Sequence, residues 1–85
     1  MIKDKKQILK EIEFIFQNLF DDDKLRISIK TKSKDLKGWD SLAHVNIILS
    51  IEKLFNFRFN PKDIYNFKNI GELVDKIFDE INENK

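Results

Sequence analysis

The chain has 85 residues, of which 41% are hydrophobic and 36% charged, and its 16 basic residues nearly balance its 15 acidic ones. This length predicts one domain, residues 1–85, and the absence of cysteine excludes disulfides, thiolate metal sites and any thiol from the protein itself. The balanced charge argues against a nucleic-acid partner, and no apolar run approaches the roughly 18 residues of a membrane span.

The first predicted element is a helix over residues 4–20, in which apolar side chains recur at helical spacing: Ile8, Ile12, Ile15, Phe16 and Leu19. Asp4 is a suitable cap for its start. The acidic run 21–23 is unfavourable at a helix C-terminus and should end the helix. That run lacks the spacing of a calcium loop, so we expect no metal site. Charged residues alternate with apolar ones from the beginning, unlike a signal peptide, so we expect a cytoplasmic protein.

Residues 21–38 are predicted to be a long connection, and loops of this length in a compact domain are often functional. Ile27 and Ile29 alternate with polar neighbours, which would permit a short strand. A single strand would have nothing to pair with. We therefore expect an ordered loop that is held by its apolar side chains, Leu25, Ile27, Ile29 and Leu36.

A second helix is predicted over residues 41–55, capped by Asp40 or Ser41. On a helical wheel its apolar residues fall into two sectors. The sector expected to face the core contains Ile47, Ile48, Ile51, Leu54 and Phe55. The other lies nearly opposite, beside Asn46 and Lys53, and contains Leu42, Val45 and Leu49. Apolar groups near solvent with polar neighbours are typical of a partner surface; the alternative is a helix buried nearly all round.

The rest of the chain is expected to contain a strand-like run, a short helix and a final long helix. Residues 56–60 alternate apolar and polar side chains. Asn60-Pro61 then supplies a cap and an N1 proline for a short helix over 61–66. A pattern close to a capping box at Asn69–Glu72 opens the last helix, 70–82, which has a regular apolar repeat: Ile70, Leu73, Val74, Ile77, Phe78 and Ile81.

Together these elements predict an all-α fold, a four-helix bundle of three longer helices and one short helix with a long first loop. The approach to the second helix reads Asp35-Leu36-Lys37-Gly38-Trp39-Asp40-Ser41-Leu42. Its apolar anchor, glycine turn and Asp-Ser-Leu resemble the attachment motif of the acyl carrier protein family. The resemblance covers essentially the whole chain, because the end of the second helix, the run from Asn60-Pro61 to Phe67 and the last helix also match the family pattern.

The resemblance implies that Ser41 is esterified by 4′-phosphopantetheine, which a separate phosphopantetheinyl transferase takes from coenzyme A. The terminal thiol would hold an acyl group as a thioester for acyl-loading and acyl-transferring enzymes of fatty-acid or specialised, polyketide-type biosynthesis. Asp40 would help the transferase to recognise the serine, and Leu42 completes the motif. The N–H groups and partial positive charge of a helix N-terminus suit a phosphodiester. From its position alone, Ser41 would be interpreted as a helix cap.

The sequence departs from the family pattern in its charge. Members are typically strongly acidic, whereas the exposed side of this second helix offers His44, Asn46, Ser50 and Lys53, with Glu52 as its acid. We therefore expect a dedicated set of partners and a partner-binding surface formed by Asp40, Leu42, Val45, Asn46, Leu49 and Lys53. We expect His44 to be a surface residue or a partner contact, and Trp39 to pack the loop onto the bundle.

We expect a monomeric carrier and not an enzyme, because Ser41 and His44 lack the orienting acid and oxyanion hole that a hydrolase needs. An aminoacyl or peptidyl carrier is the alternative within the same chemistry, although such carriers favour Gly-Gly-His/Asp-Ser over the Gly-Trp-Asp-Ser of this chain. An unmodified helical domain that docks a partner helix is the alternative from a different class. The sequence leaves open the acyl group, the pathway and whether the acyl chain enters the bundle.

Overall fold

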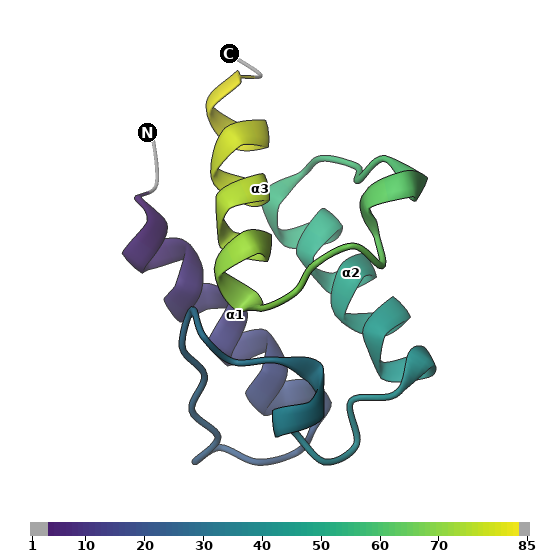
Figure 1. Ribbon diagram of the computed structural model, residues 1–85. Helices are drawn as coiled ribbons and strands as arrows, with labels where there is room; N and C mark the ends of the chain where they lie inside the picture. Colours follow the sequence, from purple (N-terminus) through teal and green to yellow (C-terminus); the bar gives the residue numbers. More distant parts are fainter. Residues whose placement is uncertain (1–3, 84–85) are drawn as a thin grey trace.

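The computed structural model describes residues 4–83, which form three α-helices: α1 (Lys5–Leu19), α2 (Ser41–Phe55) and α3 (Ile70–Glu83). Two single 3₁₀ turns, η1 (Ser33–Asp35) and η2 (Pro61–Asp63), lie in the connections (Figure 1). The helix bounds agree with the predicted ranges to within one residue. Residues 4–83 contain no strand, so the predicted all-α class is confirmed.

α1 is the common neighbour of the other two helices and packs against both. α1 begins as predicted, because the carboxylate of Asp4 accepts the Gln7 N–H at 2.8 Å. Its inner residues Ile8, Ile12 and Phe16 are fully buried. They share one core with Ile27, Ile47, Ile48, Ile51, Phe55, Phe59, Ile70, Leu73, Val74 and Ile77.

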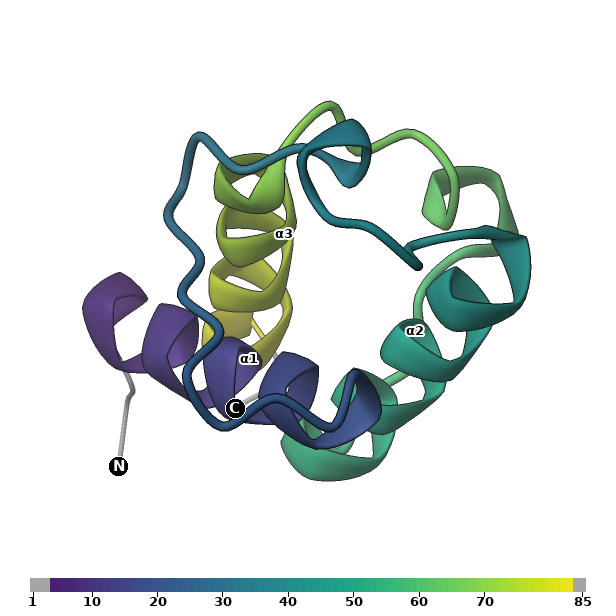
Figure 2. The same ribbon diagram turned by 90° about the horizontal axis from the view of Figure 1, so that it is seen from below.

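The loop between α1 and α2 runs back along α1 and crosses the start of α3 (Figure 2). There the N–H groups of Ile70 and Gly71 donate to the carbonyl oxygens of Thr31 and Ile29, at 2.9 and 2.8 Å. The first N–H groups of a helix have no partner inside it, so the loop supplies acceptors for α3. The side chain of Ile29 is 54% exposed. Its expected role as an apolar anchor is therefore wrong, because its backbone carbonyl makes the connection instead.

Two short elements differ from the prediction. The expected helix over 61–66 is only the turn η2, and the chain after it is irregular. In a helix the Asn66 N–H would donate to the Lys62 carbonyl, whereas here it donates to the Asp63 carbonyl. Beyond this turn, the Ile64 carbonyl binds the ring of His44 on α2. The strand-like run 56–60 is irregular as well. Asn56 ends α2 in a left-handed conformation with φ 59°, which asparagine tolerates, and the chain turns away there.

Candidate functional site

α2 begins at a sharp turn that places Ser41 at its first position. Gly38 has φ +94°, a conformation that glycine adopts without strain, and it turns the chain toward Asp40. Asp40 is the cap of α2, because its Oδ1 accepts the Ala43 N–H at 2.9 Å. Ser41 is therefore free of the capping role, and it is exposed at the surface. Another protein can reach its hydroxyl group.

The backbone around Ser41 has hydrogen-bond donors that can serve an anion. Asp40 already accepts the N–H of Ala43 with its side chain and that of His44 with its carbonyl oxygen. Within residues 4–83, the N–H groups of Ser41 and Leu42 have no acceptor. Together with the positive end of the helix dipole, they fit a phosphodiester on the Ser41 side chain.

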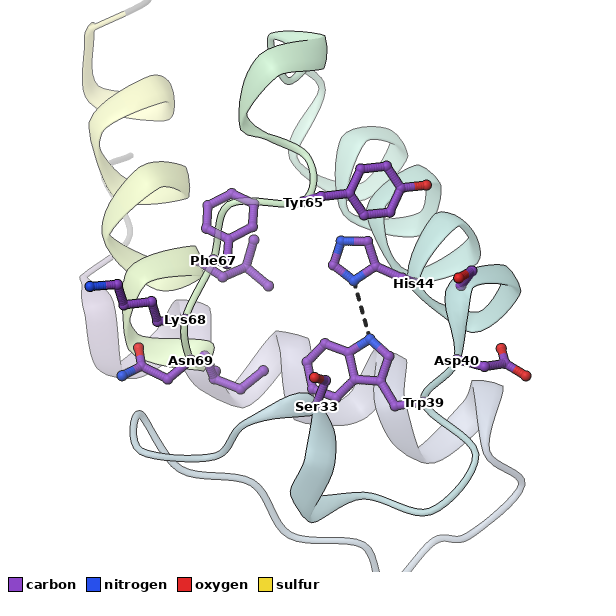
Figure 3. A pocket seen from close by; sticks show the side chains of 11 residues that line it. Ser33, Trp39, Asp40, His44, Tyr65, Phe67, Lys68 and Asn69 are labelled. Carbon is purple, nitrogen blue, oxygen red and sulfur yellow. Dashed lines mark hydrogen bonds between the residues drawn. The ribbon is translucent and has the colours of Figure 1, made fainter.

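A pocket of about 320 Å³ lies beside this helix start. Its walls come from the turn into α2, from η1, from the segment after η2 and from the first turn of α3 (Figure 3). The lining residues are Ser33, Trp39, Asp40, Ser41, His44, Tyr65, Phe67, Lys68, Asn69, Ile70 and Leu73. A group attached to Ser41 thus has a cavity of mixed apolar and polar lining next to it.

His44 connects two walls of this pocket. Its Nδ1 accepts the Trp39 Nε1–H at 3.1 Å, and its Nε2 lies 2.6 Å from the Ile64 carbonyl oxygen. An indole nitrogen can only donate, so Nδ1 is the acceptor and Nε2 carries the proton given to Ile64. Trp39 and Tyr65 stack with the imidazole at 6.0 and 5.0 Å between ring centroids (Figure 3). The bonding pattern requires a neutral imidazole.

This geometry corrects the expectation that His44 is a surface residue or partner contact, since the ring is half-buried and bonded at both nitrogens. The packing role of Trp39 is confirmed, because it meets Phe16 edge to face at 5.0 Å. The pocket residues Tyr65 and Lys68 were missed. They lie more than 20 positions from Ser41, and no local pattern links them to it.

The predicted docking residues all belong to α2 and its cap, and all are exposed: Asp40, Leu42, Val45, Asn46, Leu49 and Lys53. The apolar ones are exposed to 72% (Leu42), 38% (Val45) and 56% (Leu49). The alternative of a helix buried nearly all round is therefore wrong. Leu54, expected in the core, is 49% exposed. It lies in the last turn of α2, where the core does not extend to its side of the helix.

Other chemistry is sparse in the part of the chain that the structure describes. There, no helix combines the length and apolar character needed to cross a membrane. No cluster of three or more His, Cys, Asp or Glu in these residues could hold a metal ion.

Away from the site, the pKa of Lys76 is raised, mainly by its hydrogen bond to Glu80, and Asp63 of η2 adds to this at 3.5 Å. Lys76 stays charged at neutral pH and links α3 to η2.

Comparison with known proteins places this site in a family. The family model "Phosphopantetheine attachment site" matches residues 15–77. The acyl carrier protein of Cyanidium caldarium is 30% identical over 78 residues, which is 92% of this chain and 91% of that protein. That of Phytoplasma australiense is 28% identical over 67 residues, 79% and 88% of the two chains. The solution NMR structure of the holo acyl carrier protein from Geobacter metallireducens is similar with a TM-score of 0.76 and 34% identity, covering 91% of this chain and 92% of that one. The chain therefore belongs to the acyl carrier protein family, which is defined by a phosphopantetheine attachment site.

Proposed function

We propose that Ser41 is the residue to which 4′-phosphopantetheine is attached, and that the chain carries thioester-bound acyl groups without catalysing a reaction itself. The observation that carries this proposal is the exposed Ser41 at the first position of α2. Its hydroxyl group is not needed for capping, it has unpaired N–H groups beside it, and it lies on the rim of a pocket. These features supply access, anion stabilisation and nearby space for an attached arm.

The attachment chemistry needs only an accessible hydroxyl from this chain. The Ser41 Oγ forms a bond to the β-phosphorus of coenzyme A, the pyrophosphate bond breaks, 3′,5′-ADP leaves, and the hydroxyl proton passes to a base of the transferase. Asp40 caps the start of the helix and places a negative charge next to Ser41. The transferase recognises this charge. The prosthetic group supplies the thiol that the chain lacks, since it contains no cysteine.

We also propose that partner enzymes dock on the exposed face that begins next to Ser41, formed by Asp40, Leu42, Val45, Asn46, Leu49 and Lys53. Docking there brings a partner's active site close to the arm, so that a tethered thioester reaches it at high effective concentration. The partners are a phosphopantetheinyl transferase and acyl-handling enzymes of fatty-acid or specialised acyl biosynthesis. We place the chain in the cytoplasm as a monomer of one domain, and the match over residues 15–77 supports the single domain.

Intact-mass measurement tests the attachment site. Apo protein is incubated with a phosphopantetheinyl transferase and coenzyme A, and the wild type should gain the mass of one phosphopantetheine. Ser41→Ala should gain none, whereas Ser33→Ala, which removes another hydroxyl from the same pocket, should still be modified. Because Asp40 and not Ser41 caps the helix, S41A should change the free energy of unfolding by less than about 0.5 kcal/mol. Modification that persists in S41A would move the site elsewhere. An unmodified wild type would favour a helical interaction domain.

A further inference from the structure

The proposed docking face continues beyond Lys53 into a second hollow of about 480 Å³ at the end of α2. This hollow is lined by Leu49, Glu52, Lys53, Asn56, Phe57 and Arg58. Leu49 is 56% exposed at its edge. Phe57 is half-buried, and both Lys53 and Arg58 are exposed. The hollow therefore combines two apolar side chains and two accessible cations with Asn56 and one acid, Glu52.

In the part of the chain that the structure describes, the acids around α2 accept hydrogen bonds and the cations form no ion pair. Residues 36–60 contain two acids, Asp40 and Glu52, and three cations, Lys37, Lys53 and Arg58. Each acid accepts a backbone N–H, at 2.9 Å for Asp40 and at 2.8 Å for Glu52. Within residues 4–83, neither Lys53 nor Arg58 takes part in an ion pair.

The remaining carboxylates lie elsewhere in the molecule. Most of them belong to α3 (Glu72, Asp75, Asp79, Glu80 and Glu83) or to the run 21–23 that follows α1. Although the net charge is only +1, the acidic and basic residues are therefore unevenly distributed over the chain. Exposed charges more than about 8 Å apart are largely screened at physiological salt. The local surface at the end of α2 has two cations, Lys53 and Arg58, against one acid, Glu52, whose carboxylate accepts the Phe59 N–H.

We propose that this hollow, together with Leu42, Val45 and Leu49, docks a protein partner whose contact surface is apolar and rimmed by carboxylates. An apolar side chain of the partner enters between Leu49 and Phe57. Its Asp or Glu residues pair with Lys53 and Arg58. The inference rests on the proposed function only in treating the outer face of α2 as the docking face, and it does not need a modified Ser41.

A protein fits this surface better than an anionic membrane does. Membrane attraction through charge normally uses clusters of about four to eight Lys or Arg residues, and the hollow has two. A recess also accommodates a protruding side chain, which a protein offers and a flat lipid surface does not. Complementary charge around an apolar contact additionally excludes partners of the wrong sign.

Two synthetic amphipathic helical peptides probe this chemistry. They have leucines at the same positions and differ only in their flanking residues, which are glutamates in one and lysines in the other. Titrated into ¹⁵N-labelled apo protein, the acidic peptide should shift the amide signals of Leu49, Lys53, Phe57 and Arg58. It should bind at least about tenfold more tightly than the basic peptide at low salt, and less tightly as salt is added.

Charge-reversal variants provide the control. K53E/R58E should invert the preference, so that the basic peptide binds more tightly. K30E/K34E makes the same change in net charge at exposed loop positions outside the hollow and should leave the preference unaltered. Equal binding, preference of the wild type for the basic peptide, shifts confined to residues outside both the hollow and the neighbouring Leu42 and Val45, or no binding of either peptide would each overturn the proposal.

Two further experiments distinguish a protein partner from a membrane, and docking from attachment at Ser41. Vesicles of phosphatidylglycerol that bind the wild type but not K53E/R58E would assign the surface to a membrane and overturn the proposal. The peptide titration is repeated with Ser41→Ala, in which the same preference is expected. Docking would thus survive a failure of the attachment site, and attachment would survive a failure of docking, so the two results are distinguishable.

Discussion

Asp40 combines two roles at the start of α2 that substitution can separate. Its Oδ1 caps the helix through the Ala43 N–H, and its charge lies next to the hydroxyl group that is proposed to react. Alanine removes both the hydrogen-bond acceptor and the charge. Asparagine keeps an oxygen for the cap and removes only the charge.

Asp40→Ala should lower the free energy of unfolding by about 0.5–2 kcal/mol, because the Ala43 N–H loses its acceptor. Asp40→Asn should unfold close to the wild type. Both variants should be modified more slowly by the transferase, and in Asp40→Ala the loss of rate should exceed the loss of stability. Thermal melts and initial rates of mass gain measure the two effects. A wild-type rate for Asp40→Asn would show that the transferase does not read the charge.

His44→Phe tests the bridge across the pocket next to Ser41. Phenylalanine keeps an aromatic ring between Trp39 and Tyr65, but leaves the Trp39 Nε1–H and the Ile64 carbonyl without their partner. We expect a loss of about 1–3 kcal/mol in stability and a change in Trp39 fluorescence as the indole becomes more solvated. Wild-type stability and an unchanged Trp39 emission in H44F would contradict the bridge.

At the scale of elements, the contact between the first loop and α3 depends on a missing side chain. A Cβ atom on Gly71 would lie 2.9 Å from the Ile29 carbonyl oxygen and 3.2 Å from its Cβ. Glycine to alanine in a helix usually stabilises it by about 1 kcal/mol. Here alanine should instead lower the stability. The loop would have to move away from α3, which would break the hydrogen bond from the residue 71 N–H to the Ile29 carbonyl.

Gly71→Ala should therefore unfold at a lower temperature than the wild type, and hydrogen exchange should become faster at the amides of Ile70 and residue 71. Thermal denaturation with amide exchange measures both. An unchanged or raised melting temperature would show that the loop can adjust without losing its hydrogen bond to α3.

The two faces of α2 should respond differently to the loss of a side chain. Ile51 is fully buried, so Ile51→Ala should cost about 2–5 kcal/mol of stability through lost burial and a residual cavity. Leu49 lies on the same helix but is 56% exposed, and Leu49→Ala should change stability by less than about 0.5 kcal/mol. Urea unfolding measures both. A large effect of Leu49→Ala would show that this residue supports the fold and is not free for docking.

At the scale of the whole molecule, α1 is the helix on which the other two are assembled. The Cα radius of gyration is 12.1 Å, close to the roughly 12 Å typical of a folded domain of this length. The pocket beside Ser41 lies between the starts of α2 and α3, and residues of the adjoining loops complete its walls. Access to Ser41 therefore depends on how the loops are held, and the proposed docking face is left uncovered.

Much of this arrangement follows from short-range patterns in the sequence. The ranges of α1, α2 and α3 were predictable because apolar residues recur at helical spacing and because Asp4 and Asp40 are good caps. Asp-Ser-Leu likewise marks Ser41 as the candidate attachment residue, and the two apolar sectors of α2 predicted the exposed Leu42. These features depend on neighbours within one or two turns, so the local chain encodes them.

Only the tertiary structure decided the features that depend on distant residues. A helix after Pro61 was expected from its local signals, but the turn ends at Asp63, and the Ile64 carbonyl is bonded to the His44 ring on α2. Ile29 and Leu54 are as hydrophobic as their buried neighbours, and their exposure depends on what the rest of the chain covers. The walls of the pocket come from two parts of the chain, 33–44 and 65–73, which are about 20 residues or more apart. Which of these segments meet is settled by packing around α1, since local periodicity has no information about contacts made across the fold.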